Sequence, residues 1–491
     1  MNTESHPAAE ATYGRRNQIG LFMGPLVFLA MLLSPEPEGM NPQAWKVAAV
    51  GLWMAIWWIS EATTVYATAM LPIVLFPLLG IFGIKKAVAP YANPLIFLFM
   101  GGFLIAQAMQ RWNLHKRIAL KLLSITGTKS HRLIGGFMFT CALLSMWVSN
   151  TATAVMMMPI GVSVAMLLVG GDREKAIMAP FRTALFLGIA YGCSLGGIAT
   201  LIGTPPNALL VAFLADNHDI HIGFGQWMLA GLPLSMGLLA ITWAMLTKVI
   251  FKVPNSPIAG AEGVIDQELA AMGSMTRGEK LAGSVFLITA LLWVTRPLLS
   301  SIFPEMHLSD GGIAIGMAVV LFILPVDMEK KVFALNWEQA VRIPWGVLIL
   351  FGGGLSLASA IGATGLATWM GEALGGFAAW PVWIVLLLTV AMIVFLTEMT
   401  SNTATTAAFL PLLAVIGLQM GETAAYLAIP AAIAASCAFM MPVATPPNAI
   451  VYASGHVTIP QMARTGVFLN IICIIIITLL AEVFILRVLG V

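Results

Sequence analysis

The sequence predicts an all-α polytopic membrane protein with eleven transmembrane helices and two re-entrant hairpins in an inverted repeat, and with some helices broken inside the membrane. Hydrophobic residues make up 59% of the 491 residues and charged residues only 9%, whereas a soluble domain carries about 25% charge. Apolar runs of about 20 residues recur along the chain, a length that suits membrane-spanning helices and excludes a β-barrel. Two polar motifs, SNTAT and TPPN, each occur twice within this apolar sequence.

The apolar pattern defines each predicted element in turn. Full spans are expected at residues 19–34, 44–61, 66–84, 93–110, 183–215, 226–250, 282–302, 311–326, 343–361, 423–454 and 467–488. The segments 183–215 and 423–454 are longer than about 30 residues, so each can hold two half-helices with a break between them. Two further apolar stretches, 133–170 and 380–417, contain the SNTAT copies. We expect each of these two to enter and leave on the same side, as a re-entrant hairpin.

Lysine and arginine residues predict the orientation. With the N-terminus in the cytoplasm, the cytoplasmic segments hold all of the 24 basic residues except Lys46, Lys85, Lys86, Arg296 and Arg487. An excess of basic residues on the cytoplasmic side is the general rule for membrane proteins. We therefore expect a multi-pass protein of the cell (inner) membrane with its N-terminus in the cytoplasm and its C-terminus outside. The segment from Asp327 to Trp345 mixes charged and apolar residues and is either an interfacial amphipathic helix or an ordinary loop.

The chain contains an internal repeat that reaches beyond SNTAT. The stretch FMGGFLIAQAM at Phe99 resembles LFGGGLSLASA at Leu350, and GTPPNALLVA at Gly203 matches ATPPNAIVYA at Ala444. Under the predicted topology the two glycine-rich spans run in opposite directions, so the halves are related by inversion, a common plan for secondary transporters with a site at the membrane midplane. The alternative is an ancient duplication retained only for packing.

The two motifs predict helix ends inside the membrane. Proline is favoured at the first helical position and Ser, Thr and Asn at the cap, so Thr204-Pro205 and Thr445-Pro446 predict helix restarts. SNT at Ser149 and at Ser401 similarly predicts a hairpin tip that caps the second arm. Four helix N-termini with free N–H groups would favour an anion. The carbonyls at the ends of the preceding arms would suit a small cation.

Side chains near these ends limit the chemistry. Ser145 and Thr397 lie four residues before each SNT serine and so one helical turn below it. Hydroxyl, amide and carbonyl oxygens are plausible sodium ligands. No Lys, Arg, Asp or Glu lies in 133–171, 183–215 or 423–463. An anion there would meet no arginine from these segments, which favours symport with cations but leaves exchange open.

Single polar residues in these segments have both structural and functional interpretations. Asn207 and Asn448 are expected to brace the broken backbone, with substrate contact as the second interpretation. Thr153 and Thr405 are expected to be packing residues. Glu398 is the one ionisable group of the second hairpin, and the corresponding residue of the first is Met146. Its role stays open between a structural partner and a coupling group.

Signatures of enzymes and metal centres are absent from the sequence. HExxH, GxSxG, a Walker loop and CxxC do not occur, and none of the seven histidines has metal-ligand spacing. Cys141, Cys193, Cys437 and Cys473 lie inside apolar segments without paired spacing, which predicts small core residues without disulfides. We therefore expect no enzyme activity, no organic cofactor and no nucleic-acid partner.

The paired SNT tips and TPPN breaks resemble those of the divalent anion:sodium symporter (DASS) family, which carries dicarboxylates, citrate or sulfate. The resemblance covers about the whole chain, from the span at 19 to the last one. It implies a homodimer with an elevator mechanism, in which a transport domain moves against a scaffold. The scaffold would comprise the N-terminal spans of 1–132 and the central loop and spans of 251–379. The transport domain would comprise 133–250 and 380–491, each with a hairpin, a broken helix and the following span.

The resemblance also implies which residues bind ions and substrate. The first sodium site would use Ser145, Ser149, Asn150 and the backbone of Gly203. The second would use Thr397, Ser401, Asn402 and the backbone of Ala444. The substrate carboxylates would contact Asn150, Thr151, Thr204, Asn402, Thr403, Thr445 and Pro446. The chain has a suitable residue at each of these positions.

The expected function is sodium-coupled symport of a C4-type dicarboxylate such as succinate, fumarate or malate, with Na+ as the co-transported ion. Within the same family, a sodium-independent dicarboxylate exchanger and a citrate or sulfate carrier are the alternatives. A channel would require the breaks to line a continuous pore. The motifs alone do not separate these possibilities.

Overall fold

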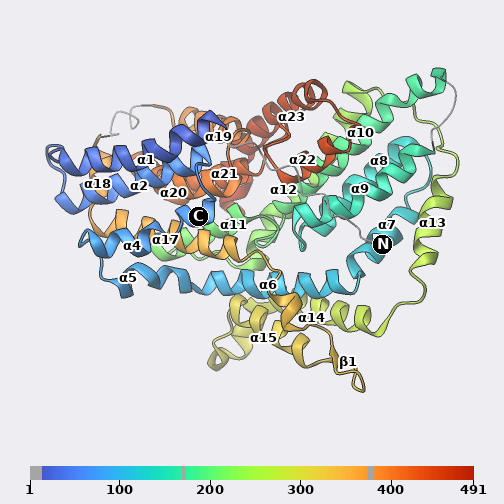
Figure 1. Cartoon of the computed structure of the whole chain (residues 1–491), viewed down its shortest axis with the longest axis horizontal. Coiled ribbons are helices and arrows are strands. Elements are labelled where there is room, and N and C mark those ends of the chain that lie inside the picture. The colour runs from blue at the N-terminus through green and yellow to red at the C-terminus, as the bar shows by residue number, and fades with distance from the viewer. Residues whose placement is uncertain (1–13, 168–171, 374–379) are drawn as a thin grey trace.

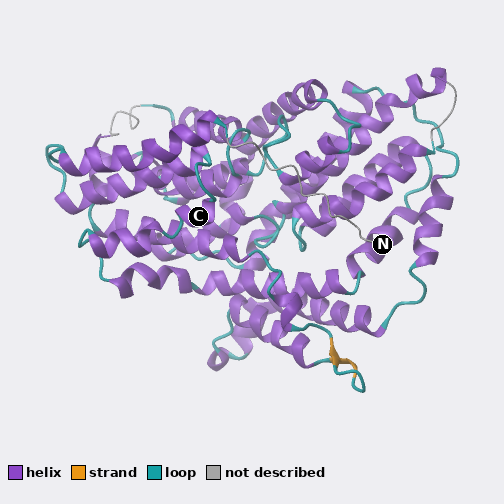
Figure 2. Cartoon of the chain, viewed as in Figure 1, coloured by secondary structure: helices purple, strands orange, loops and turns teal. Residues whose placement is uncertain are grey.

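The computed structural model describes residues 14–167, 172–373 and 380–491, with the side chains of 172–178 outside the description. The fold is built almost entirely of helices (Figure 2). Within the described residues, seven helices are long and apolar enough to cross a membrane. These are α1 (Arg15–Leu33), α6 (Pro94–Arg111), α12 with its π-helical extension (Phe224–Ile250), α14 (Arg277–Ile302), α17 (Trp345–Ala363), α20 (Asn402–Gln419) and α23 with its extension (Ile459–Leu489). The predicted helical membrane class is confirmed, and the count of eleven spans stays a prediction. The cytoplasmic placement of Arg173 and Lys175, which lie outside the described side chains, likewise stays a prediction.

The first predicted spans are found, except that one is broken. Helix α2 (Pro42–Ser60) matches the expected second span. The span expected at 66–84 is instead divided into α3 (Val65–Thr68) and α4 (Leu71–Leu78), so the prediction of one continuous helix is wrong there. The reason is Pro72, which has no N–H to donate to the carbonyl of Thr68, the residue where α3 ends. Short helices α5 (Ile84–Val88) and η1 (Ala89–Ala92) then lead into α6.

The segment after α15 (Asp310–Ile323) is a loop. It contains a two-stranded hairpin, β1 (Pro325–Asp327) with β2 (Val332–Phe333), and the one-turn helix α16 (Trp337–Ala340) (Figure 2). The alternative of an interfacial amphipathic helix is therefore wrong. The chain continues into α17 as predicted, and α18 (Leu366–Ala373) follows it.

Both SNTAT stretches form helical hairpins. The first consists of α8 (Ser130–Ser145) and α9 (Asn150–Met166), and the second of α19 (Val382–Thr397) and α20. Ser149 caps α9 by accepting from the N–H of Ala152 at 3.2 Å, and Ser401 caps α20 by accepting from that of Ala404 at 3.5 Å. The predicted helix start at each SNT motif is thus confirmed.

Both long spans are broken where TPPN predicts. Helix α10 (Asp172–Gly197) is followed by α11 (Pro205–His218), and α21 (Ala425–Ala435) by α22 (Pro446–Ala453). Each second half-helix begins at the first proline of its motif, as the fixed φ of proline and its missing N–H favour. The break covers 198–204 in the first half and the longer stretch 436–445 in the second.

Glycines bring α10 against α8. A Cβ added at Gly192 would lie 2.7 Å from the carbonyl oxygen of Met138, and one at Gly196 would lie 2.3 Å from that of Ala142. Small residues one turn apart permit such close approach of two helices in a membrane. One further turn along, Thr200 reaches Met146 at the hairpin tip. The close packing at Gly192 and Gly196 therefore determines where the first break lies along α8 relative to the first hairpin tip.

The two halves exchange their second half-helices. Helix α11 packs against α17, α20 and α21 of the second half, and α22 packs against α9 and α10 of the first (Figure 1). Each break therefore delivers a helix start to the other half's hairpin.

Helix α7 (Leu114–Ser124) lies outside the predicted spans and is held by buried charge. It packs on α13 (Ala261–Ala271), which also lies outside those spans. Its Arg117 forms a buried ion pair at 2.6 Å with Glu279 of α14 and donates to the carbonyl of Gly273, just after α13, at 2.9 Å. Burying a charged pair is tolerated when further hydrogen bonds satisfy its remaining groups. The four cysteines are buried with free thiols, as predicted.

Candidate functional site

The first hairpin tip holds buried oxygen atoms that lack partners. Ser145 is the last residue of α8 and is fully buried, and its hydroxyl has no hydrogen-bond partner among the described residues. The side-chain oxygen of Asn150, the first residue of α9, is likewise buried without a partner in the described part of the chain. Leaving a buried polar atom unpaired costs about 1–3 kcal/mol. Such atoms are therefore candidates for binding a ligand.

The first break lies directly against this tip. A Cβ added at Gly197 would lie 3.1 Å from the amide nitrogen of Asn150 and 3.0 Å from the carbonyl oxygen of Gly203. A Cβ at Gly203 would lie 2.5 Å from the carbonyl oxygen of Gly197. The structure thus brings Asn150 and Gly203, two residues of the predicted first sodium site, close to the same side of Gly197.

Thr200 holds the first break to the tip, a contact that no motif in the sequence predicts. Its hydroxyl donates to the carbonyl of Met146 at 2.5 Å and accepts from the N–H of Gly203 at 3.0 Å. Thr200 is fully buried. The brace between the first tip and the first break is therefore uncharged.

The second tip presents a cluster of crowded oxygens. The hydroxyl oxygen of Thr397, the last residue of α19, lies 2.5 Å from the side-chain oxygen of Asn402 and 3.0 Å from the carbonyl oxygen of Ala435. A threonine hydroxyl has one hydrogen and can donate to only one of these acceptors. Oxygen atoms so close, with one hydrogen among them, form an arrangement that a small cation would stabilise. The structure brings Thr397 and Asn402 together, as the second predicted sodium site requires.

Glu398 occupies the second break with its carboxylate. Its Oε1 accepts from the N–H of Phe439 at 2.6 Å and its Oε2 from the N–H of Met441 at 3.0 Å, while Met440 donates to both oxygens at 2.9 and 3.0 Å. Asn470 on α23 donates to Oε1 at 2.7 Å. Three consecutive backbone N–H groups of this kind form an anion-binding nest. Glu398 is therefore a structural partner of the break, which is one of the two interpretations left open by the sequence, and the role of a coupling group stays a prediction. The sequence feature that could have pointed to Asn470 is that it is a single amide side chain within the largely apolar predicted span 467–488.

Asn207 and Asn448 brace the two breaks in the same way. Each amide nitrogen donates to the carbonyls ten and seven residues earlier, at 3.2 and 2.8 Å for Asn207 and at 3.2 and 3.0 Å for Asn448. Asn207 also contacts the carbonyl of Ile198 at 3.3 Å. Both side chains are fully buried. The prediction that they hold the broken backbone is confirmed.

The N–H groups available to an anion differ from the sequence prediction. The first two residues of α11 and of α22 are prolines, which have no N–H. The third N–H is already used, since Asn207 donates to the carbonyl of Thr204 at 3.3 Å and Asn448 to the hydroxyl of Thr445 at 3.3 Å. The expectation of free N–H groups at all four helix starts is therefore wrong at the two TPPN breaks. It applies to α9 and α20, whose first N–H groups have no partner within the helix.

The predicted substrate residues differ in exposure. Thr151 and Pro446 are exposed, Asn150 and Asn402 are half-buried, and the remaining three, Thr204, Thr403 and Thr445, are buried. Because α22 packs on α9 and α11 packs on α20, each SNT tip shares its surroundings with the break of the other half. The candidate substrate surface is thus assembled from both halves.

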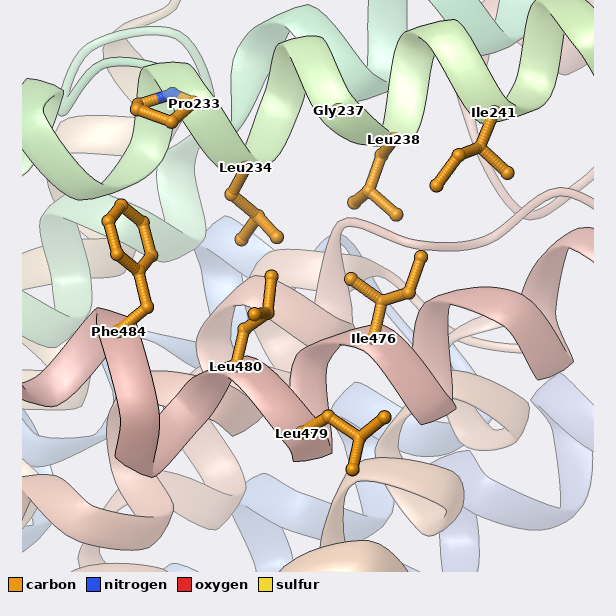
Figure 3. A pocket seen from close by; sticks show the side chains of 9 residues that line it. All are labelled: Pro233, Leu234, Gly237, Leu238, Ile241, Ile476, Leu479, Leu480 and Phe484. Carbon is orange, nitrogen blue, oxygen red and sulfur yellow. The ribbon is translucent and has the colours of Figure 1, made fainter.

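Apart from the carboxylate of Glu398, which lies in the second break, the chemistry of the site is that of neutral oxygens and amides. No group of three or more His, Cys, Asp or Glu residues with metal-binding geometry occurs in the described residues. A groove of about 400 Å³ between α12 and α23 offers a contrast, because its lining, including Leu234, Leu238 and Phe484, is aliphatic and aromatic (Figure 3). Such a lining cannot orient a carboxylate, so the SNT tips are the better candidate site.

Known proteins resemble this chain over almost its whole length. The family described as "Sodium:sulfate symporter transmembrane region" matches residues 15–490. A "Sodium-dependent dicarboxylate transporter SdcS" of Staphylococcus saprophyticus is 40% identical over 493 residues, with 99% of this chain and 95% of that protein covered. The protein of the same name from Staphylococcus aureus strain USA300 is 42% identical, with 96% and 92% covered. The crystal structure of the Alcanivorax borkumensis YdaH transporter covers 96% of each chain with a TM-score of 0.55 at 12% identity, which is a likeness of fold alone.

Proposed function

Because the chain belongs to the sodium:sulfate symporter family, we propose that it is a secondary transporter that couples sodium to the uptake of C4-type dicarboxylates such as succinate, fumarate and malate. Relatives with 40% and 42% identity are named sodium-dependent dicarboxylate transporters, which supports both the ion and the substrate class. Their being transporters also supports a role other than that of an enzyme. The co-transported ion is Na+, and no organic cofactor takes part.

The observation that carries this proposal is the set of neutral oxygens at the two tips. A dicarboxylate brings two negative charges to a site that has no arginine or lysine on the described parts of either hairpin or broken helix near the tips. Bringing anions into a membrane without compensating charge is strongly unfavourable. Two cations bound at the unpartnered oxygens of Ser145 and Asn150 and at the crowded oxygens of Thr397 and Asn402 would supply that charge.

The ligands are assigned by half. In the proposal the first sodium site is formed by Ser145, Ser149, Asn150 and the Gly203 carbonyl, and the second by Thr397, Ser401, Asn402 and the Ala444 carbonyl. The substrate carboxylates contact the N–H groups that begin α9 and α20 together with the side chains of Asn150, Thr151, Thr204, Asn402, Thr403 and Thr445, and Pro446 packs beside them.

The transport cycle belongs to the same proposal. Eleven spans with two re-entrant hairpins place the N-terminus in the cytoplasm and the C-terminus outside. The exchange of α11 and α22 between the halves supports a structural repeat, because each break then meets the other half's hairpin, and in the proposal this repeat is inverted. The segments 133–250 and 380–491 form a transport domain that moves as an elevator against a scaffold of 1–132 and 251–379 in a homodimer.

Uptake by purified protein in liposomes tests the coupling. We expect an inward sodium gradient to drive accumulation of labelled succinate, and replacement of sodium by choline to abolish it. Unchanged uptake without sodium would contradict symport and favour a dicarboxylate exchanger. Saturation and counterflow distinguish a carrier from a channel.

Sulfate is the second candidate substrate, because the family description names it. Competition measures the choice directly: excess unlabelled succinate, fumarate or malate is expected to suppress uptake, and sulfate or citrate is not. Uptake of labelled sulfate without uptake of labelled succinate would assign the chain to sulfate.

A further inference from the structure

Glu398 places a carboxylate beside one tip only. It follows Thr397 directly in the chain and is 3% exposed. In the first half the corresponding position, three residues before the SNT serine, is Met146, which contributes only its backbone carbonyl to Thr200. The two cation sites of the proposed function therefore have different electrostatic surroundings.

The hydrogen bonds of Glu398 match an ionised carboxylate. All of its partners, the N–H groups of residues 439–441 and the amide of Asn470, are donors. An ionised carboxylate only accepts, whereas a protonated acid would direct its own hydrogen at one of these donors. Among the described residues, no lysine, arginine or histidine forms an ion pair with Glu398. Its negative charge is thus balanced by amides alone.

The braced segment connects the backbone of the second cation site. Residues 439–441 lie between Ala435, whose carbonyl oxygen is 3.0 Å from the hydroxyl of Thr397, and Ala444, whose carbonyl is assigned to the same site. Glu398 holds this segment by hydrogen bonds. Gly466 of α23 also packs against it, so closely that an added Cβ would lie 2.4 Å from the backbone of Phe439. The position of the carbonyls therefore depends on Glu398.

The first half makes the equivalent connections without charge. Gly231 of α12 approaches the carbonyl of Ile198 as Gly466 approaches Phe439. One turn further along each helix, Ser235 donates to the carbonyl of Leu195 at 2.7 Å, whereas Asn470 donates to Glu398. The two halves thus share the close glycine contact and the side-chain donor one turn further along, and they differ in that only the second half has a carboxylate there.

We propose that Glu398 is a positioning residue that makes the second cation site, at Thr397 and Asn402, bind sodium more tightly than the first, at Ser145 and Asn150. It holds the carbonyls of the break in place and adds a buried negative charge that attracts the cation. The inference rests on the proposed function, since it concerns the same two sodium sites. It predicts an order of binding in which the second site fills first.

Glu398→Gln tests the charge and the brace together, because glutamine keeps the shape but turns an NH2 group, itself a donor, toward N–H groups that one carboxylate oxygen accepts. We expect the sodium concentration for half-maximal succinate uptake to rise about tenfold, as loss of a nearby buried charge implies. The KM for succinate at saturating sodium should change by less than about twofold. Glu398→Asp, which retains the charge, is expected to restore part of the sodium affinity. Asp310→Asn is the matched control, because Asp310 is also a buried carboxylate that accepts a backbone N–H but pairs with Arg296 on α14. It should leave sodium dependence unchanged.

A second measurement leaves Glu398 in place and decides the matter if Glu398→Gln does not fold. Sodium stabilises a protein that binds it by an amount that rises with the logarithm of one plus the ratio of sodium concentration to Kd, so the melting temperature in detergent reports binding without transport. With the first site impaired by Ser145→Ala, the melting temperature should begin to rise at about tenfold lower sodium than with the second site impaired by Thr397→Val. Equal values in the two variants, or an unchanged sodium dependence in Glu398→Gln, would overturn the inference. Wild-type protein that neither is stabilised nor transports with sodium would overturn the proposed function itself.

Discussion

The two SNTAT tips have the same five residues, but their side-chain oxygens differ in whether they have hydrogen-bond partners. At the first tip the oxygens of Ser145 and Asn150 are buried without partners among the described residues. At the second tip the oxygens of Thr397 and Asn402 lie 2.5 Å apart, and Glu398 beside them is held by backbone amides. The motif therefore specifies where the helix begins and which side chains reach the tip. The residues around it decide how those side chains are satisfied.

The two breaks differ in length and in the room they leave. The first, 198–204, folds back so tightly that Gly197 and Gly203 are in backbone contact. The second, 436–445, is longer, and it accommodates Ala438 and Ala444 at the corresponding positions. The shorter connection needs glycine because a Cβ would meet a carbonyl. The break beside the first TPPN copy therefore requires glycine at positions 197 and 203, whereas the break beside the second copy accepts alanine at the corresponding positions.

The largest effect is expected from Asn150→Ala and Asn402→Ala, because each removes a side chain assigned to both cation and substrate. Loss of two such interactions implies a fall in succinate uptake of about 100-fold. The comparison predicts different melting temperatures: Asn150→Ala removes an unpartnered oxygen and should cost little stability, whereas Asn402→Ala removes a contact of Thr397. Near-normal uptake in both variants would refute the site.

The next largest effect is a loss of uptake that is expected from a substitution in the first break and not from its counterpart in the second. Gly203→Ala would place a Cβ 2.5 Å from the carbonyl oxygen of Gly197. Overpacking of about 1–3 kcal/mol implies a fall in uptake of about tenfold. Ala444→Gly is the matched variant in the second half, and we expect less than about a twofold change, because it relieves rather than adds contact. Equal loss in both variants would show that the breaks are not distinguished by space.

A smaller effect concerns the asparagine braces. Asn207→Ala leaves the buried carbonyls of Gly197 and Thr200 without this donor, while that of Ile198 still accepts from Trp227. Asn448→Ala leaves only the carbonyl of Ala438, because that of Met441 still accepts from the N–H of Ala444. Each unpaired buried group costs about 1–3 kcal/mol, so both melting temperatures should fall, and that of Asn207→Ala further. Sodium dependence of the remaining uptake should be unchanged in each. A shift in sodium affinity without loss of stability would assign these residues to the ion site.

The smallest effect compares the threonines inside SNTAT. The hydroxyl of Thr153 is buried without a partner in the described residues, whereas that of Thr405 lies 2.6 Å from the hydroxyl of Thr400. Thr153→Val should therefore leave stability unchanged or raise it, and Thr405→Val should lower it by about 1 kcal/mol. Uptake is expected within about twofold of wild type in both. Loss of transport in Thr153→Val would place this hydroxyl among the ligands.

Helix starts were predicted correctly where they depend only on neighbouring residues, namely on capping serines and on prolines. The cap preference of Ser149 and Ser401 and the restart preference of Pro205 and Pro446 depend only on neighbouring residues, and the structure bears them out. The break at Pro72 followed from an equally local rule, but the apolar run around it suggested one continuous span. The prolines that start α11 and α22 have no N–H groups. The number of helix starts with free N–H groups is therefore two, at α9 and α20, and not the four expected from the sequence.

The sequence by itself determined the membrane class, the two hairpins, the two broken helices and the positions of the polar motifs, because hydrophobicity, caps and prolines act within a few residues. Only the tertiary structure decided which oxygens lack partners and which helix start lies beside which tip. It also decided that the carboxylate of Glu398 occupies the nest at 439–441 and meets Asn470. Those contacts join residues about 40 to 70 positions apart. They depend on how closely Gly466 and the glycines of α10 let the backbones approach, which no local pattern in the chain records.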